Sequence, residues 1–536
     1  MIGPGVVNWP AGDARTREMT AHHGEALLLK VLRDCLDNED IGPSDNFFAM
    51  GGDSILALDV IAAMRDQGLR ISMRDMLTRA TVRELASSAI PLPEDEPAVA
   101  TADPFASLDD RERQRLPAGV VAVQPASVLQ LALIYLAEMA SGPKPYTDFL
   151  GLRVIGALDE KALRAALRQT MERHRMLRSS FDLDSFAEAK QLIWAEVEEP
   201  LTVEREEDGQ RAEEVVRAWQ DGLLADGIAW DQPPAFRCQV VASAGSFRLS
   251  VAVHHSIVDG WSFARLLVDL LTYYDAACGG SPAALPPVAE QAHHDFVALE
   301  QADAAAAEAT RFWLDQAAGP PLLIDEGRQS PADPTARRFL PIPQARWRRL
   351  RQAADDFGVP IKSLLLAAHG WALGRLTGRA TVVSGVVVSG RPEIQGADRL
   401  VGLFLNTLPI RLPEVTGPWA EMAAAARDAE ASGMPYRRYP LAHLERALGR
   451  TPFDVSFNFT HFRIFEELTG LRGLHTDNWW AYDKASFPMQ VGVLVDAPES
   501  GTGLAVSFDP GLLAANRIER YLALMDQAFD LAARGR

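Results

Sequence analysis

Two adjacent histidines, His254 and His255, are followed a few residues later by Asp259 and Gly260. Histidine exchanges a proton near neutral pH, so either imidazole is a candidate for general acid–base chemistry. Asp259 can orient an imidazole or pair with a distant cation, and the Gly260 N–H is a candidate donor to an oxyanion. A bare pair of histidines is more often part of a core, so these four residues alone leave both interpretations open.

The residues around the pair predict the elements that position it. Phe247, Leu249, Val251 and Val253 alternate with other side chains, which predicts a half-buried strand. His255 continues the apolar face of that strand, whereas His254 lies on the opposite face. An apolar stripe at helical spacing follows Gly260 and includes Phe263, Leu266, Leu267, Leu270 and Leu271. His255 is therefore expected at a strand end, in apolar surroundings and near a helix N-terminus.

Ser54 is a second candidate for chemistry. It ends the loop IGPSDNFFAMGGDS, in which Gly51 and Gly52 permit a turn, and a helix is predicted to begin at about this serine. Helical spacing before the loop begins at Glu25, and a short helix is predicted after Thr81, which forms a plausible capping box with Glu84. These patterns predict a small helical bundle. A serine at a helix start commonly serves only as an N-cap.

Length and composition limit the classes of function. The 536 residues are too many for one core and suggest two to four domains. A net charge of −19 argues against nucleic acid or an anionic membrane surface as a partner. No apolar run approaches the length of a membrane span. The three cysteines are far apart and lack metal-ligand spacing, so we expect no metal site and a cytoplasmic location.

The segment DNFFAMGGDSILAL resembles the carrier motif of peptidyl carrier proteins, and Ser54 matches the serine that bears the cofactor. The resemblance covers the predicted bundle and implies covalent 4'-phosphopantetheine on Ser54, attached by a phosphopantetheinyl transferase. One residue departs from the commonest form of the motif, because Asp53 stands where many carriers have histidine. The GGDS form is often seen on carriers that serve epimerisation domains.

The string HHSIVDGWS resembles the HHxxxDG signature of nonribosomal peptide synthetase condensation domains. Further segments resemble the other motifs of that family in the expected order: QPASVLQ (124–130), ERHRMLRSSF (172–181), HDFVALE near Asp295, VGLFLNTLPIR (401–411) and GRTPFDVSFNFT (449–460). Arg175 replaces a usual glutamate, and YRRYPLAHLER keeps its motif poorly. The resemblance implies that His255 and His254 with Gly260 are catalytic, and that Asp259 pairs with Arg391 of VVVSGRPE across the active site.

This resemblance implies a small all-α four-helix carrier bundle followed by an α/β two-lobed, chloramphenicol-acetyltransferase-like condensation domain. The expected limits are a carrier (16–90), a linker (91–123) with one short helix near Leu108–Arg115, an N-terminal lobe (124–295) and a C-terminal lobe (296–536). The implied reaction is amide formation between a donor thioester on Ser54 and an acceptor amine. The implied partners are an upstream adenylation domain and a downstream acceptor carrier protein.

Other members of this superfamily were weighed against the same residues. An epimerisation domain shares HHxxxDGWS but typically has an EGHGR string, which is absent here. Heterocyclisation domains replace the histidines with aspartates, and stand-alone acyltransferases lack a fused carrier. A catalytically silent scaffold that only docks carriers would be expected to have a damaged active-site string, and this string is intact. The sequence does not decide whether His255 removes a proton from the amine, positions it or stabilises the intermediate.

Overall fold

The structure is a computed structural model. It describes residues 14–36, 38–53, 55–79, 81–92, 103–140, 144–206, 211–289, 292–320, 322–324, 335–412, 416–471, 473–482, 486–498 and 500–534, with the side chains described from Gly24 onward. Ser54 lies outside these residues, so the carrier loop is described through the neighbours of this serine. Within the described part of the chain, no helix has the length and apolar character needed to cross a bilayer.

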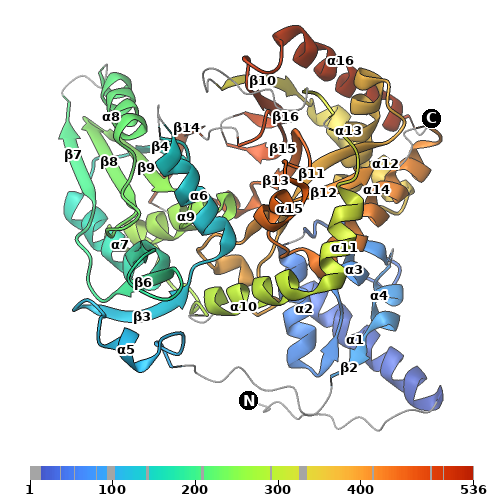
Figure 1. The fold of residues 1–536 in the computed structure, drawn as a ribbon, viewed down its shortest axis with the longest axis horizontal. Coiled ribbons are helices and arrows are strands. Elements are labelled where there is room, and N and C mark those ends of the chain that lie inside the picture. The colour runs from blue at the N-terminus through green and yellow to red at the C-terminus, as the bar shows by residue number, and fades with distance from the viewer. Residues whose placement is uncertain are drawn as a thin grey trace.

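The N-terminal region is the expected bundle of helices (Figure 1). Its elements are α1 (Ala14–Leu36), α2 (Leu56–Asp66), β1 (Leu69–Arg70), α3 (Met73–Thr78), α4 (Val82–Ser88) and β2 (Ile90–Pro91). Helix α1 begins at Ala14, well before Glu25, so it includes residues that precede the apolar stripe. Thr81 accepts a hydrogen bond from Glu84 N at 3.2 Å, which is one half of the predicted capping box. One oxygen of Asp53 accepts from the backbone N–H groups of Ile55 and Leu56 and caps the start of α2.

A twisted sheet of five strands forms the N-terminal lobe, with the order β14-β4-β9-β8-β7, in which β14 (His475–Tyr482) comes from the C-terminal half of the chain. A smaller sheet, β3-β6-β5, lies below it. The elements of this lobe up to the helix that follows the two histidines are α5 (Asp110–Arg113), β3 (Val120–Pro125), α6 (Val128–Met139), β4 (Thr147–Ile155), α7 (Glu160–Arg173), η1 (Arg175–Arg178), β5 (Ser179–Asp182), β6 (Lys190–Trp194), β7 (Leu201–Arg205), α8 (Ala212–Asp226), β8 (Phe236–Ser243), β9 (Ser246–His254) and α9 (Gly260–Ala277). The predicted strand and helix around the histidines are β9 and α9.

The C-terminal lobe is built on a six-stranded sheet with the order β10-β16-β15-β13-β11-β12. Its elements are α10 (Ala292–Ala305), α11 (Ala307–Gln316), β10 (Ala336–Pro341), α12 (Gln344–Asp356), α13 (Ile361–Thr377), β11 (Val382–Ser389), η2 (Ala397–Arg399), β12 (Leu405–Leu412), α14 (Trp419–Gly433), η3 (Met434–Tyr436), α15 (Leu441–Leu448), β13 (Val455–His461), β15 (Met489–Ala497), β16 (Gly501–Phe508) and α16 (Ala515–Ala532). The two lobes diverge in a V, with α6 and α15 on the facing walls (Figure 1).

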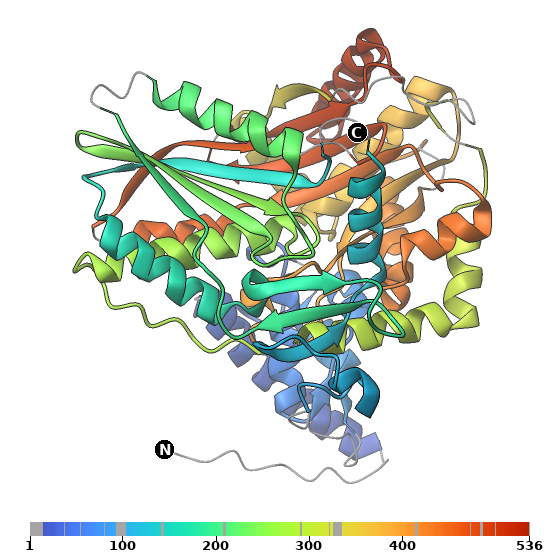
Figure 2. The same cartoon turned by 60° about the vertical axis from the view of Figure 1, so that its left-hand side comes forward.

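One segment of the C-terminal half crosses to the other lobe, which the expected division at residues 295 and 296 does not include. The 3-10 helix η4 (Arg463–Gly470) packs on α9, and β14 (His475–Tyr482) pairs antiparallel with β4. In Figure 2, this orange to red segment leaves the C-terminal lobe and runs to the strands of the N-terminal lobe. Helix α10 also runs across the expected boundary between the lobes. The lobes are thus tied together by two separate segments as well as by the active-site contacts below.

Candidate active site

The turn after β9 carries the two histidines into different surroundings. His255 N donates to Tyr146 O at 2.8 Å, which continues the pairing of β4 with β9 by one residue. Its imidazole is partly exposed and lines a cavity of about 1160 Å³ between the lobes. The ring atom Nδ1 lies 2.8 Å from Asp148 Oδ2 on β4. His255 is therefore the histidine of the pair that faces a space large enough for substrates.

His254 is buried inside the sheet. Its Nδ1 accepts from Ser256 N at 3.2 Å and lies 2.7 Å from Ser256 Oγ. Burial, together with the neighbouring His255, lowers the pKa of His254 to about 4. The His254 ring is therefore neutral at physiological pH and its Nδ1 contacts Ser256 of the turn, and the catalytic role expected for His254 stays a prediction.

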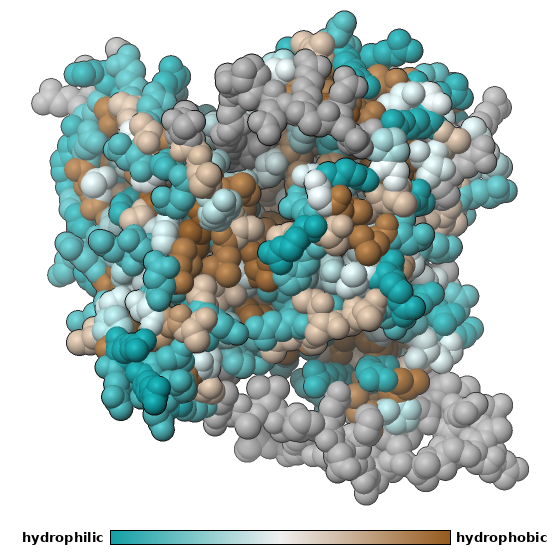
Figure 3. All heavy atoms as spheres, viewed as in Figure 1, coloured by the Kyte–Doolittle hydropathy of each residue, from teal (hydrophilic) through white to brown (hydrophobic). Residues whose placement is uncertain are grey.

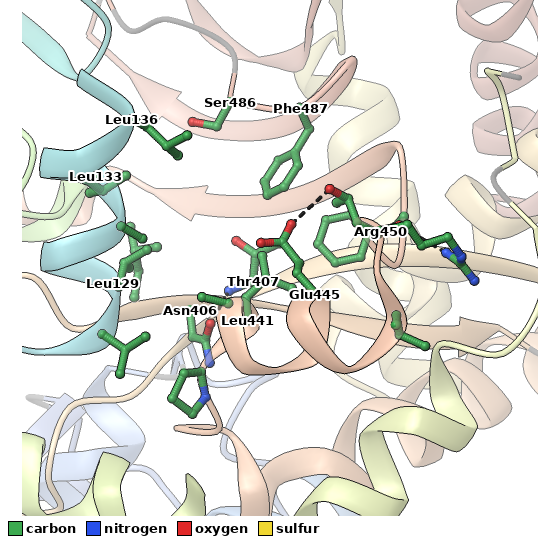
Figure 4. A pocket seen from close by; sticks show the side chains of 18 of the residues that line it. Leu129, Leu133, Leu136, Asn406, Thr407, Leu441, Glu445, Arg450, Ser486 and Phe487 are labelled. Atoms are coloured by element: carbon green, nitrogen blue, oxygen red, sulfur yellow. Dashed lines mark hydrogen bonds between the residues drawn. The ribbon is translucent and has the colours of Figure 1, made fainter. Parts of the chain in front are cut away.

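The cavity has one apolar wall and one mixed wall (Figure 4). Leu129, Leu133 and Leu136 project from α6, and Asn406 and Thr407 of β12 lie opposite them with α15. The remaining labelled side chains of this site are Leu441, Glu445, Arg450, Ser486 and Phe487. In the space-filling view, hydrophobic side chains gather in the hollow between the lobes (Figure 3). An apolar pocket with a few polar groups is the usual form of a small-molecule site.

The QPASVLQ segment places α6 against the histidine turn. Ser127 and Gln130 form a reciprocal capping box at the start of α6. The Gln130 side chain also donates to Ser256 O at 3.0 Å, so the helix that forms one cavity wall is anchored to the turn. Both residues are buried, and a polar contact of this kind is costly to leave unmade.

Asp259 and Arg391 form a buried pair between α9 and the C-terminal lobe. Two hydrogen bonds join them, from Nη1 to Oδ2 at 2.8 Å and from Nη2 to Oδ1 at 3.0 Å. Asp259 also accepts from Ser262 N, and the guanidinium lies over the ring of Phe404. Burial alone would raise the pKa of Asp259, but the charge and hydrogen bonds of Arg391 hold that pKa below its usual value. The pair stays ionised and fixes the turn that presents His255.

Removing either partner of this pair should destabilise the protein strongly, because the other charge would remain buried. Asp259→Ala and Arg391→Ala are each expected to lower the free energy of unfolding by about 3–5 kcal/mol. The double variant should cost less than the sum of the two single changes. Chemical denaturation of all four proteins measures this coupling, and strict additivity would contradict it. Glu519→Ala, which breaks the exposed ion pair with Arg338, is a control expected to cost less than about 1 kcal/mol.

Gly260 is the first residue of α9 and is exposed to solvent. It is not one of the described residues that line the cavity with His255. The expected role of its N–H as an oxyanion donor therefore finds no support in this geometry. The preceding amide, Asp259 N, donates to Gly402 O at 3.0 Å and is therefore not available as an oxyanion donor.

The predicted phosphopantetheine loop lies against the C-terminal lobe. Arg463 donates to Gly51 O at 2.9 Å, and Asp59 of α2 accepts from Gly396 N at 3.0 Å. Gly51, Gly52 and Asp53 line one side of a narrow cavity of about 130 Å³, and residues of the lobe line the other: Lys362, Ser389 and Arg437 among them. The loop residues next to Ser54 thus line a small space that suits a thin, flexible chain such as phosphopantetheine.

Neighbouring residues line the narrow cavity and the large one. Ser389 of the narrow cavity pairs across β11 and β12 with Leu405, which lines the large cavity. Arg437 and Arg438, which are consecutive in the chain, line the narrow and the large cavity respectively. The carrier loop and His255 thus line two cavities whose linings include residues that are neighbours in the sheet or in the chain.

Docking of the carrier should weaken as the pH rises. In the docked state, burial and then the negative charge of Asp398 raise the pKa of Asp59, which reaches about 7. In the undocked carrier, Asp59 has the ordinary carboxyl pKa near 4. Docking therefore takes up a proton, and it becomes less favourable as the pH rises from about 4 to about 7. Small-angle scattering should show a more compact protein at pH 5.5 than at pH 7.5.

Asp59→Asn mimics the protonated carboxyl and should stay compact at both pH values. Asp66→Asn, an exposed change at the end of the same helix, should behave as the unchanged protein. A wild-type radius of gyration that is equal at the two pH values would contradict this expectation.

Two residues near the cavity were missed by reasoning from the sequence. Asp148 approaches His255 from a neighbouring strand, and Glu300 of α10 accepts from Val128 N at 2.9 Å at the start of α6. Burial raises the pKa of Glu300 to about 7. No local pattern indicates a role for either residue, because their contacts depend on the pairing of segments far apart in the chain. Among the described residues, no cluster of histidine, cysteine or acidic side chains has the geometry of a metal site.

Comparison with known proteins gives the family. Residues 120–494 match the condensation domain family, and residues 26–88 match the phosphopantetheine attachment site family. This chain belongs to the condensation domain family. The resemblance to a carrier–condensation didomain of nonribosomal peptide synthetases is confirmed, and with it the covalent 4'-phosphopantetheine of the carrier.

Curated relatives of this didomain are parts of larger synthetases. AMB antimetabolite synthetase AmbE of Pseudomonas aeruginosa is 34% identical over 529 residues, which is 94% of this chain and 24% of that protein. Surfactin synthase subunit 1 of Bacillus subtilis is 24% identical over 515 residues, or 93% of this chain and 13% of that protein. The chain therefore spans about a quarter or less of the length of these relatives.

Solved structures confirm the expected two-lobed fold. The first condensation domain of the CDA synthetase aligns with a TM-score of 0.63 at 22% identity and covers 77% of this chain and 97% of that one. The condensation domain of monacolin K polyketide synthase MokA aligns with a TM-score of 0.63 at 19% identity and covers 78% and 98%. At these identities the alignments show only the fold, and the chemistry depends on the residues of this chain.

Proposed function

We propose that this didomain forms an amide bond between a donor acyl group held by its own carrier and an acceptor amine. The observation that carries the proposal is that the carrier loop and His255 open onto two cavities that are lined in part by neighbouring residues. The loop residues Gly51–Asp53 line the narrow cavity, and His255 lines the large one. A donor entering from the carrier side and an amine entering from the other side would meet near His255.

When attached at Ser54, phosphopantetheine supplies a thiol that holds the donor acyl group as a thioester. His255 faces the space where the amine attacks, and its imidazole accepts the proton that the amine loses as the C–N bond forms. The buried pair of Asp259 and Arg391 keeps the turn of His255 in place during this step. The apolar wall of α6 excludes water from the acyl group and so limits hydrolysis.

We propose three partners for this didomain. A phosphopantetheinyl transferase modifies Ser54, an upstream adenylation domain supplies the activated donor, and a downstream carrier protein presents the acceptor amine. We propose that these steps take place in the cytoplasm. A silent docking role is the alternative on this fold, since the X-domain from teicoplanin biosynthesis, solved in complex with OxyB, shares it at 21% identity. The position of His255 in a large cavity favours catalysis.

Delivery by the tethered carrier should make amide formation independent of protein concentration. A tether of this kind gives an effective concentration of about millimolar, which free carriers cannot match at micromolar levels. The didomain is loaded at Ser54 and mixed with a large excess of a soluble amine acceptor over a tenfold range of didomain concentration. The first-order rate constant should stay the same. A rate constant that rises in proportion to didomain concentration would show delivery between molecules and would contradict the proposal.

A further inference from the structure

Glu300 of α10 is a buried acid that lines the large cavity together with His255. The residue is only 4% exposed, and its Oε2 accepts a hydrogen bond from Val128 N at 2.9 Å. Within the described part of the chain, this carboxyl group has no other hydrogen bond, and its second oxygen, Oε1, is not sealed from solvent. Glu300 can therefore present one oxygen to a molecule that occupies the cavity.

The first turn of α6 connects Glu300 with the turn that carries the histidine. Val128, which donates to Glu300, comes two residues before Gln130, whose side chain donates to Ser256 O at 3.0 Å. Ser256 directly follows His255 in the chain. A molecule bound beside the start of α6 is therefore close to both the carboxyl group and the imidazole.

Among the residues that the structure describes, no positively charged side chain pairs with Glu300. Burying a carboxylate without a counter-charge is costly, because burial removes the water that stabilises the charge. Burial raises the pKa of Glu300 to about 7, although the hydrogen bond from Val128 N acts in the opposite direction. A cationic group on a ligand would offset this cost. An α-amino group has an ordinary pKa of about 8, so a proton can pass between the two groups near neutral pH.

The other acids and arginines that line this cavity, within the described residues, have partners of their own. Arg438 donates to a carboxylate, and Arg450 donates to backbone carbonyl groups. Asp454 accepts from two backbone N–H groups with one oxygen, and its other oxygen is sealed from solvent. Glu445 accepts from a neighbouring threonine hydroxyl and is partly exposed. Glu300 is thus the acid of this cavity that combines deep burial with an oxygen open to a ligand.

We propose that Glu300 is a catalytic residue that binds the acceptor amine in its ammonium form and removes the first proton, so that the neutral amine can attack. This inference rests on the proposed function and deepens it, because it adds a step before the attack. An N–H bond of the ammonium group breaks, its electron pair stays on nitrogen, and an O–H bond forms on Glu300. The neutral nitrogen then attacks the thioester, its next proton passes to His255 and on to the departing thiolate, and the proton on Glu300 leaves to water.

Capping of α6 is the other role that this geometry offers to Glu300, and Glu300→Gln separates the two roles. The amide oxygen of glutamine can still accept from Val128 N, but the side chain cannot take a proton from an ammonium group at neutral pH. Thermal unfolding of this variant should therefore match that of the unchanged protein. Glu172→Gln, an exposed change near the end of α7, is the matched control and should leave every measurement unchanged.

The kinetic test compares two nucleophiles in single turnover of the didomain loaded at Ser54. With a primary amine that is an ammonium ion at pH 7, Glu300→Gln should slow amide formation by about tenfold or more. With a weakly basic alkoxyamine, which is neutral at pH 7, the variant should keep the rate of the unchanged protein. The loss with the primary amine should also disappear above the pKa of that amine, where no first proton remains to be removed. Equal slowing with both nucleophiles at every pH, or no slowing with either, would overturn the proposal.

A binding measurement tests the same site without amide formation. Carbon-13 NMR of the didomain labelled on its glutamate carboxyl carbons follows the titration of Glu300, whose signal is assigned by its loss in Glu300→Gln. Propylammonium chloride should lower the titration midpoint of Glu300, whereas the same concentration of sodium chloride should not, because a bound cation favours the charged carboxylate. A midpoint that propylammonium leaves unchanged would overturn the proposal. If the unchanged didomain forms no amide with either nucleophile, the proposed function fails, and this titration still decides whether Glu300 binds an ammonium group.

Discussion

A Ser54→Ala variant incubated with a phosphopantetheinyl transferase and an acyl-coenzyme A should show no gain in mass. The unchanged protein should gain one acyl-phosphopantetheine group, measured by intact-mass spectrometry. The reason is chemical, because only a hydroxyl at the loop that follows Gly51 and Gly52 can form the phosphodiester bond. Loss of modification is expected to be complete, which makes this the largest effect among the predictions.

The matched control for this variant lies in the same loop. Asp53→Ala removes the carboxylate that accepts from Ile55 N and Leu56 N but keeps the hydroxyl of Ser54. It should still be modified, with a modest loss of stability of about 1 kcal/mol from the missing cap. A Ser54→Ala protein that still gains the full mass would place the attachment on another residue and contradict the account of the carrier.

His255→Ala is expected to slow amide formation by roughly 100- to 10,000-fold, the range typical of a lost general acid–base group. Loading of Ser54 should be unaffected, because the carrier loop and His255 line different cavities. The rate is measured by single turnover of the loaded didomain with a saturating soluble amine.

His254→Ala provides the comparison for this result. The ring of His254 is buried, neutral and directed to Ser256, so its loss should destabilise the turn more than it affects the chemical step. Turnover at the unchanged rate in His255→Ala would remove that residue from the mechanism and favour a docking role for the domain.

Local patterns predicted the parts of the site that lie within one segment. The alternation from Phe247 to Val253 and the stripe that starts at Phe263 correspond to β9 and α9. The same alternation assigned His254 and His255 to opposite faces. The pairing of Asp259 with Arg391 came from the resemblance, since nothing in their spacing along the chain shows that they meet.

Features that depend on contacts between distant segments could not be predicted from the sequence. Strand β14 joins the sheet of the other lobe, and no local pattern indicates which sheet a single strand will join. The approach of Asp148 to His255 requires the register of β4 against β9. The docking of α2 through Asp59 depends on how two folded domains meet. Each of these is set by tertiary packing, which a single sequence does not display.

The central claim is that the carrier in this chain presents the donor. It is tested most directly by intact-mass measurement of the didomain loaded at Ser54 with an acyl group and mixed with an amine on a separate carrier. We predict that the didomain returns to the mass of its unacylated phosphopantetheine form, while the separate carrier gains the acyl group through an amide. A didomain that instead gains the mass of the group from the separate carrier would reverse the direction of transfer and contradict the account.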